Sequence, residues 1–411
     1  MRKFILFIIV SLSFACCKEP NAVDPNIDTP DETDTPQTTL MYMTGTDLTY
    51  YFNQNITAIK AAVSLNSLGS GRFLIFKHDS SLTGSLVEYK YENGTCTTET
   101  LKVYDYIVSL TQSGIEEVIA DIKELAPAKE YNLIVSGHAT GWVPKEMQSS
   151  WTKVAKSGEF INWEAMLTSP IVTRYLGSSN DGFFDISEFK KSLDATDTHF
   201  GYILFDECFM SSIESLYTLR NNCDYIVASP CEIMGSGFPY DTVIPKLFSD
   251  SGTKYDLQGA CEAFYNYYCD YSYPSGCVAM TVTSELEDLA EVTRLINTKY
   301  SDVVVDTSEI QPYERLANHV FLDFEEYMLA KCTNDASLTT QFLDQMERAF
   351  PTESRLHTER FFANIGVSAS SANSYDAYYT TIEYYSGVTT SAANELLSTY
   401  WNECEWAIAV N

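Results

Sequence analysis

The amino-acid sequence predicts an α/β fold with a mostly parallel central sheet and helices on both faces. Three apolar runs, at residues 40–43, 131–136 and 202–205, have the length and composition of buried strands. Segments with helical spacing of apolar residues, such as 115–122, lie between them. This alternation indicates parallel pairing, because parallel strands need a crossover connection, which is usually a helix. With 411 residues the chain is long enough to bury one large core.

The amino-terminal half alternates short strands with helical spacing. The expected elements are a strand at 40–43, a helix at 56–63, a strand at 72–77, and two strands at 86–91 and 97–103. Asn93-Gly94 lies between the last two and favours a tight hairpin turn, because both residues tolerate a positive φ. Ser113 to Glu116 matches a capping box, which predicts a helix that ends before Pro127.

The remaining chain continues this alternation to about residue 299 and is less regular beyond it. Strands are expected at 225–228 and 278–282, and helices at 213–220, 285–298, 338–349 and 392–405. Asp185 to Glu188 matches a second capping box. We therefore expect a domain at 40–299 and a helical and mixed region at 300–411 that packs on it.

The charge of the chain excludes one class of partner. Its formal net charge is −30 at pH 7. Nucleic-acid binding needs a basic surface that releases counterions from phosphates, so no nucleic-acid partner is expected. Acidity also keeps a protein soluble, and it would mildly steer cationic substrates towards it.

The first residues have the features of a secretory signal. Arg2 and Lys3 precede an apolar run at 4–12 that is too short to span a membrane stably. Cys16 follows the small residue Ala15, and this order resembles a bacterial lipoprotein cleavage site. We predict a signal peptide at 1–15 and acylation of Cys16, with acylation of Cys17 or an ordinary cleaved signal as alternatives.

Residues 16–39 are rich in Pro, Thr and acidic side chains and have almost no large apolar ones. Such a segment cannot bury enough surface to offset its ordering entropy, so a disordered acidic tether is expected. Together these features predict an exported lipoprotein at the outer membrane or cell surface, or on a periplasmic face. Its contact with the membrane would be through the lipid alone, and we expect a monomer.

The cysteine spacing gives no evidence for a metal site or a compact disulfide framework. Of the 11 cysteines, eight remain after Cys16, Cys17 and Cys208 are set aside. None of them forms a CxxC pair of the kind that binds zinc. We expect most of them to be small buried apolar residues, and we predict no cofactor.

His138 and Cys208 are the candidate reactive residues, because each follows directly after a predicted buried strand. In an open α/β sheet, reactive groups gather at the carboxyl ends of the strands. A thiol attacks a carbonyl as the thiolate, which a nearby imidazole and a helix beginning at the cysteine would both favour. Spacing alone leaves a second interpretation open, in which Cys208 is simply a buried apolar residue.

The local sequences around both residues add a resemblance to a known family. Residues 133–142 (LIVSGHATGW) and 202–212 (YILFDECFMSS) resemble the histidine and cysteine motifs of the clostripain-like cysteine peptidases. Residues 225–229 (YIVAS) and 235–240 (GSGFPY) are similar to further family segments in the same order. The resemblance covers roughly residues 40–289.

The resemblance implies a caspase-like sandwich and an endopeptidase that cleaves polypeptides after Arg or Lys through a His138 and Cys208 dyad. It places the oxyanion hole at the backbone N–H groups of Ala139 and Cys208. A main-chain donor does not depend on its side chain, so Ala139 can replace the more usual glycine. Some relatives use calcium, but no calcium site can be placed in this sequence. Self-cleavage between the two motifs is also implied, and Lys153 or Lys156 is the expected site.

Three positions bear on how closely this chain follows the family. Asp206 matches an acidic residue of the specificity pocket, where it would pair with a basic substrate side chain. The second acidic position of that pocket corresponds to Ser236, so the basic preference would depend on one carboxylate. Glu207 adds a charge next to the nucleophile and would oppose thiolate formation if it faced the sulfur, so we expect it to point away.

Two other functions remain as alternatives. One is a catalytically silent surface lipoprotein of the same fold that binds peptides, which Glu207 and Ser236 would favour. The other is a binding lipoprotein with no chemistry in its cleft. Turnover of a basic peptide that depends on Cys208 would separate the enzyme from both alternatives.

Overall fold

A nine-stranded sheet runs through the part of the chain that the structure describes. This computed structural model describes residues 34–411 except 81, 145–184, 249–254, 273 and 367–374, and residues Asp34–Asn411 form one compact unit. The strand order is β10-β8-β7-β6-β5-β1-β2-β3-β4. The strands are β1 (Gln37–Met43), β2 (Arg72–Ser80), β3 (Thr83–Glu92), β4 (Thr95–Tyr104), β5 (Glu130–Ser136), β6 (Phe200–Asp206), β7 (Cys223–Ala228), β8 (Cys277–Val282) and β10 (Leu356–His357).

The centre of this sheet is parallel and its edges are antiparallel. Strands β2, β1, β5, β6 and β7 pair in parallel, whereas β3, β4, β8 and β10 pair antiparallel with their neighbours. Every residue of β1 and β6 is buried, as expected for strands covered on both faces. The predicted α/β fold with a mostly parallel sheet is confirmed.

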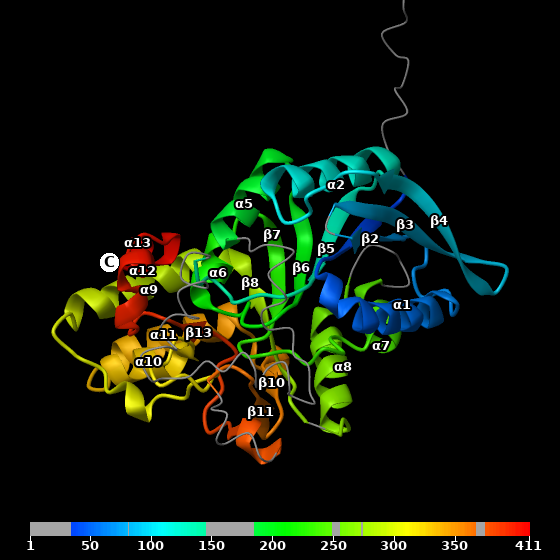
Figure 1. Cartoon of the computed structure of the whole chain (residues 1–411). Helices are drawn as coiled ribbons and strands as arrows, with labels where there is room; N and C mark the ends of the chain where they lie inside the picture. Colours follow the sequence, from blue (N-terminus) through cyan, green and yellow to red (C-terminus); the bar gives the residue numbers. More distant parts are fainter. Residues whose placement is uncertain (1–33, 81, 145–184, 249–254, 273, 367–374) are drawn as a thin grey trace, which may run out of the picture. The chain divides into compact units, whose positions relative to one another are not determined.

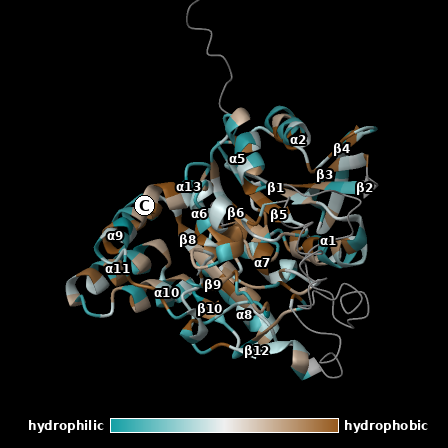
Figure 2. Ribbon diagram, turned by 60° about the vertical axis from the view of Figure 1, so that its left-hand side comes forward, coloured by the Kyte–Doolittle hydropathy of each residue, from teal (hydrophilic) through white to brown (hydrophobic). Residues whose placement is uncertain are grey.

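Helices form a layer on each face of the sheet (Figure 1). One layer packs α1 (Thr49–Val63) against α7 (Tyr240–Leu247) and α7 against α8 (Leu257–Cys269). The other packs α2 (Gln112–Leu125) against α5 (Ile186–Ala195) and α5 against α6 (Ile213–Thr218). In Figure 2 hydrophobic residues gather along the central strands and hydrophilic ones along helices such as α2 and α9 (Leu286–Lys299). In the described part of the chain, no helix is long and apolar enough to cross a membrane.

The local signals in the sequence have mixed outcomes. Asn93 and Gly94 both have positive φ, 52° and 84°, and they join β3 to β4 as predicted. The capping box at Asp185 and Glu188 is present at the start of α5. The one predicted at Ser113 is wrong, because α2 begins earlier and the Thr111 hydroxyl accepts the Gly114 N–H at 3.2 Å.

The C-terminal region is joined to the sheet and to the segment that follows Cys208. Strand β10 extends the sheet beside β8, and β13 (Thr389–Thr390) forms a bridge with Ser212 just before α6. The region also contains α10 (Phe324–Lys331), α11 (Ala336–Ala349), α12 (Ser398–Trp401) and α13 (Glu405–Val410), and the short strands β9 (Leu322–Asp323), β11 (Arg360–Phe362) and β12 (Tyr379–Thr381).

The helix predicted at 392–405 is wrong, since α12 and α13 are separate short helices. Trp401 donates from its indole nitrogen to buried Glu214, and Trp406 packs edge-on against Tyr217 and Phe324. In one continuous helix these two side chains would point about 140° apart. The break therefore lets both indoles reach buried partners.

Candidate active site

Three neighbouring strands end at the candidate site. Strand β5 lies between β6 and β1, and the register pairs Ser136 of β5 with Asp206 of β6. Cys208 and His138 each lie two residues beyond these paired positions. On the other side, Met43 of β1 pairs with Ser136, and the Thr44 N–H donates to the Ser136 carbonyl at 2.9 Å. The sheet therefore places His138 between the loop that carries Cys208 and the loop after β1.

The Cys208 thiol is fully buried and contacts the loop that follows β7. Its Sγ accepts a hydrogen bond from the Ile233 N–H at 3.2 Å and lies 3.8 Å from the Ile233 carbonyl oxygen. The helix predicted at 213–220 is α6, which begins at Ile213 with Ser212 as its cap, so no helix begins at Cys208 itself. A hydrogen bond from an N–H group favours a thiolate over a thiol. The Ile233 N–H therefore has the effect that a helix beginning at the cysteine would have had.

The His138 ring uses its two nitrogens differently. Nε2 lies 3.1 and 3.2 Å from the two carboxylate oxygens of Asp47, while buried Nδ1 has no hydrogen-bond partner among the described residues. Within that part of the chain no hydrogen bond joins His138 to Cys208, whose sulfur faces Ile233. Hydrogen bonds between catalytic groups are often long without substrate, so the absence of this bond does not exclude the predicted pair.

Sequence reasoning missed Asp47. It lies in the short helix η1 (Thr46–Leu48), just beyond β1, whereas His138 follows β5. The available signal was an acidic residue shortly after a strand expected to be parallel. Using that signal requires knowing that β1 lies next to β5, which no local pattern states.

The predicted oxyanion donors are the backbone N–H groups of Ala139 and Cys208. Ala139 follows His138 directly and is partly exposed. Its N–H donates to no described group, so it is available to a substrate oxygen. The second predicted donor, the Cys208 N–H, lies in the neighbouring loop.

Asp206 is fully buried at the end of β6. Its carboxylate accepts hydrogen bonds from the Tyr240 hydroxyl at 2.7 Å and from the Ser136 hydroxyl at 3.2 Å. Ser236 is partly exposed four residues before Tyr240, and its hydroxyl lies 3.2 Å from that of Tyr271. Ser236 therefore lies in the loop between β7 and α7, which also contacts the Cys208 sulfur, and Asp206 contacts Tyr240 at the start of α7.

Glu207 is 7% exposed and lies beside the loop after β5. One of its carboxylate oxygens is 3.0 Å from the position that a Cβ at Gly137 would take, and the Thr44 hydroxyl is 2.6 Å from it. Any larger residue at 137 would displace these groups. Gly137 therefore lets the loops after β1, β5 and β6 approach one another.

Gly141, in the His138 loop, packs closely against Phe209, the residue after Cys208. Its φ is +62°, and a Cβ there would lie 2.6 Å from the Phe209 carbonyl oxygen. The next residue, Trp142, donates from its indole nitrogen to the Ser391 hydroxyl at 2.8 Å. The loop is therefore held on one side by a close backbone contact and on the other by the C-terminal region.

Replacing Gly141 with alanine is expected to lower the free energy of unfolding by about 2 kcal/mol, because the new Cβ meets a backbone oxygen and the positive φ disfavours it. Denaturant unfolding of purified protein measures this loss. Gly94→Ala is the matched control: it also has a positive φ, but open space surrounds its Cβ position. Equal losses in the two variants would show that the contact with Phe209 contributes nothing.

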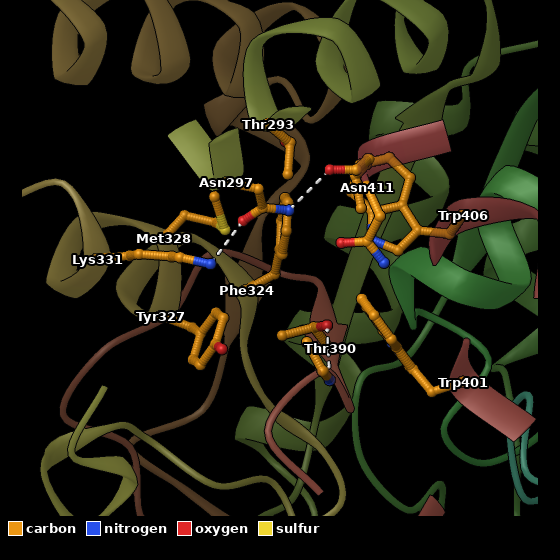
Figure 3. Close-up of a pocket in the computed structure, with 12 residues that line it drawn as sticks. Thr293, Asn297, Phe324, Tyr327, Met328, Lys331, Thr390, Trp401, Trp406 and Asn411 are labelled. Atoms are coloured by element: carbon orange, nitrogen blue, oxygen red, sulfur yellow. Dashed lines mark hydrogen bonds between the residues drawn. The ribbon is translucent and has the colours of Figure 1, made fainter. Parts of the chain in front are cut away.

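A separate cavity of about 140 Å³ lies between α9 and the C-terminal region (Figure 3). Phe324, Trp401 and Trp406 line it, and Lys331 donates there to the Asn297 side chain at 2.8 Å. Neither His138 nor Cys208 contributes to it, so it is not the candidate active site. The predicted lipidation at Cys16 and the cleavage sites at Lys153 and Lys156 lie outside the described residues.

The sheet and its strand ends define the class of protein: an α/β fold of the caspase-like type found in C11 cysteine proteases. The chain belongs to the clostripain family, whose model, Peptidase_C11, matches residues 41–402. The resemblance inferred from the two motifs is thereby confirmed. A comparison with curated protein sequences found no match.

Several solved structures of C11 proteases are similar to this chain. The secreted C11 cysteine protease "iotapain" from Bacteroides thetaiotaomicron is 32% identical, with a TM-score of 0.78, covering 92% of this chain and 99% of that one. An inactive zymogen C11 protease from Parabacteroides distasonis is 26% identical, with a TM-score of 0.74 over 92% and 99%. A Bacteroides thetaiotaomicron clostripain in complex with the peptide inhibitor BTN-VLTK-AOMK is 32% identical, with a TM-score of 0.50 over 57% and 99%.

Proposed function

We propose that this protein is a cysteine endopeptidase that hydrolyses peptide bonds after Arg or Lys, with Cys208 as nucleophile and His138 as its acid–base partner. The observation that carries the proposal is the register of β5 and β6. It places the family's histidine and cysteine motifs at adjacent strand ends, each two residues past the paired residues Ser136 and Asp206.

His138 acts as a base and then as an acid in both halves of the proposed reaction. Its imidazole takes the Cys208 proton, and the thiolate attacks the substrate carbonyl carbon to form a tetrahedral intermediate. The N–H groups of Ala139 and Cys208 stabilise the new oxyanion. The imidazolium then protonates the leaving amine as the C–N bond breaks. Water, deprotonated by His138, then attacks the thioester carbon, the C–S bond breaks, and the imidazolium returns the proton to the Cys208 sulfur.

Two observations support a basic substrate residue. Asp206 supplies a carboxylate next to the Cys208 loop. The inhibitor bound to the related clostripain contains the peptide VLTK, whose last residue is lysine. Asp206 is bonded to Tyr240 and Ser136 in the present state. A substrate ammonium or guanidinium would therefore have to reach a carboxylate already held by two hydroxyls. Such a carboxylate is oriented in advance and acceptor-only, which suits a cation.

Full burial of Cys208 bears on activation, since a substrate can reach the sulfur only after neighbouring groups move. The inactive zymogen among the related structures is consistent with a latent state. We propose that cleavage between His138 and Cys208, near Lys153 or Lys156, accompanies activation. The positions of these lysines in the sequence are the basis for that choice.

Export is also part of the proposal. The amino-terminal segment has the features of a signal peptide, and the related iotapain is described as secreted. Acylation of Cys16 would attach the enzyme to a membrane through the lipid, with residues 16–39 as the tether. The substrates would then be extracellular or periplasmic polypeptides, acted on by a monomer without a metal cofactor.

A panel of fluorogenic peptides that differ only in the residue before the cleaved bond tests the function. We expect turnover after Arg and Lys, little after Leu or Asn, and one equivalent of label on Cys208 from a lysyl acyloxymethyl ketone. Limited trypsin treatment beforehand should increase both rates if cleavage activates the enzyme. Turnover after Leu or Asn alone would overturn the pocket assignment, and labelling without turnover of any peptide would favour the silent peptide-binding alternative.

A further inference from the structure

Asp47 and His138 are neighbours because of the order of the strands. Strand β1 pairs with β5 through Met43 and Ser136, and the two loops that follow carry Asp47 and His138. Gly45 makes the turn between β1 and η1 with a φ of +108°. A Cβ at that position would lie 3.4 Å from His138 Cδ2 and 3.6 Å from an Asp47 carboxylate oxygen. The imidazole and the carboxylate therefore both lie close to the bare backbone of this glycine.

The contact between the two side chains determines which nitrogen of His138 carries hydrogen. A carboxylate only accepts hydrogen bonds, so an Nε2 that lies 3.1 and 3.2 Å from its oxygens must be the protonated nitrogen. In a neutral ring the lone pair is then on Nδ1. That atom is buried and has no hydrogen-bond partner among the described residues. The ring nitrogen that can accept a proton is therefore Nδ1, which Asp47 does not contact.

The geometry points to Asp47 as a positioning residue of the peptidase, which holds His138 in the Nε2–H tautomer and leaves Nδ1 to take the proton of Cys208. This inference rests on the proposed function of the two motif residues. During attack the thiol proton moves to Nδ1, and Nε2–H stays bonded to the carboxylate, which stabilises the imidazolium. In the next step Nδ1–H is given to the leaving amine and the ring returns to the same tautomer. Asp47 neither gains nor loses a proton.

A second histidine pair provides a matched control. His199 Nε2 lies 2.8 Å from an Asp224 carboxylate oxygen, so this is also an imidazole–carboxylate pair, but His199 Nδ1 lies 3.3 Å from the Asn221 carbonyl oxygen. Both of its side chains are more than half exposed, at 56% and 58%, whereas the His138 side chain is only 12% exposed. Exposed pairs of this kind contribute little to stability. His199 directly precedes β6 and Asp224 lies near the start of β7, so the pair is at the opposite ends of these strands from Asp206 and contacts none of the residues in the proposed mechanism.

The first test is kinetic, on the active enzyme with a lysyl or arginyl fluorogenic peptide. Asp47→Ala is expected to lower kcat by roughly 10²-fold, with KM changing by less than about threefold, because proton transfer is impaired and binding is not. Asp47→Glu should recover part of the rate, since it restores an acceptor. Asp224→Ala should leave both constants unchanged. An Asp47→Ala enzyme with wild-type kcat, or one altered only in KM, would overturn the inference.

The second test does not depend on activity. Nitrogen-15 NMR of histidine-labelled protein distinguishes Nε2–H from Nδ1–H imidazole, and a His138→Gln sample assigns the signal. In a Cys208→Ala background we expect His138 as the Nε2–H tautomer with Asp47 present, and a mixture of tautomers with Asp47→Ala. An Nδ1–H ring with Asp47 present would overturn the inference. If the tautomer shifts as expected but the parent enzyme cleaves no peptide, the proposed function fails while the positioning of His138 by Asp47 stands.

Discussion

Replacing Cys208 with alanine is expected to abolish peptide hydrolysis, with a loss on the order of 10⁴-fold or more. Alanine has no atom that can attack a carbonyl, and no other described residue in the proposed mechanism is a nucleophile. His138→Ala removes the general base and should lower kcat by roughly 10² to 10⁴-fold. Initial rates with a lysyl fluorogenic peptide measure both effects, and thermal unfolding checks that each variant is folded.

Cys261→Ala is the control for this prediction. Cys261 is also fully buried, in α8, and burial raises the pKa of its thiol far above the usual range, so it is expected to be unreactive. Its replacement should leave the rate unchanged. Hydrolysis that persists in Cys208→Ala protein, or that disappears in Cys261→Ala protein with intact folding, would contradict the assignment of the nucleophile.

Replacing Glu214 with leucine is expected to lower the free energy of unfolding by about 3 kcal/mol. Glu214 is fully buried in the first turn of α6 and accepts three hydrogen bonds on one oxygen, from the Thr390 hydroxyl at 2.9 Å, the Ser391 N–H at 2.9 Å and the Trp401 indole at 3.0 Å. Leucine would leave these buried donors without an acceptor. Chemical denaturation measures the loss, and a fall in Tm of roughly 5–10 °C should accompany it.

Glu214→Gln tests whether this acid is neutral in the folded protein. Burial raises the pKa of the Glu214 carboxyl, and its second oxygen has no hydrogen-bond partner among the described residues. A raised folded-state pKa favours folding fully below the unfolded pKa, and that contribution is lost as pH rises through the folded pKa. Glutamine keeps an acceptor oxygen and does not titrate. The stability of wild type relative to Glu214→Gln should therefore fall as the pH rises from the ordinary glutamate range to the raised pKa of the folded state.

A constant difference between these two proteins across that pH range would show that Glu214 does not titrate there. A Glu214→Leu protein as stable as wild type would show that the three donors find other partners. The second result would also weaken the inference that Glu214 holds the C-terminal region against α6, which begins five residues after Cys208.

Much of the fold could be predicted from the sequence because its signals are local. Buried strands such as β1 and β6 are short apolar runs, and the turn at Asn93-Gly94 requires residues that tolerate a positive φ. The cap at Thr111 was missed because two hydroxyl residues two positions apart offer competing starts for the same helix. The antiparallel direction of β8 also leaves no trace in its own residues, since burial is similar in either direction.

The candidate site also has features that the sequence predicted and others that only the tertiary structure shows. The motifs alone predicted His138 and Cys208 as the reactive pair. The register of β5 and β6 brings the ends of the two preceding strands side by side. Tertiary structure alone decided that the Ile233 N–H contacts the Cys208 sulfur, that Asp47 contacts His138, and that α12 and α13 separate around the two tryptophans. Residue type and periodicity report only whether each segment is buried and how it turns. These contacts depend on which distant segments the strand order brings together, and that order results from the packing of the whole sheet.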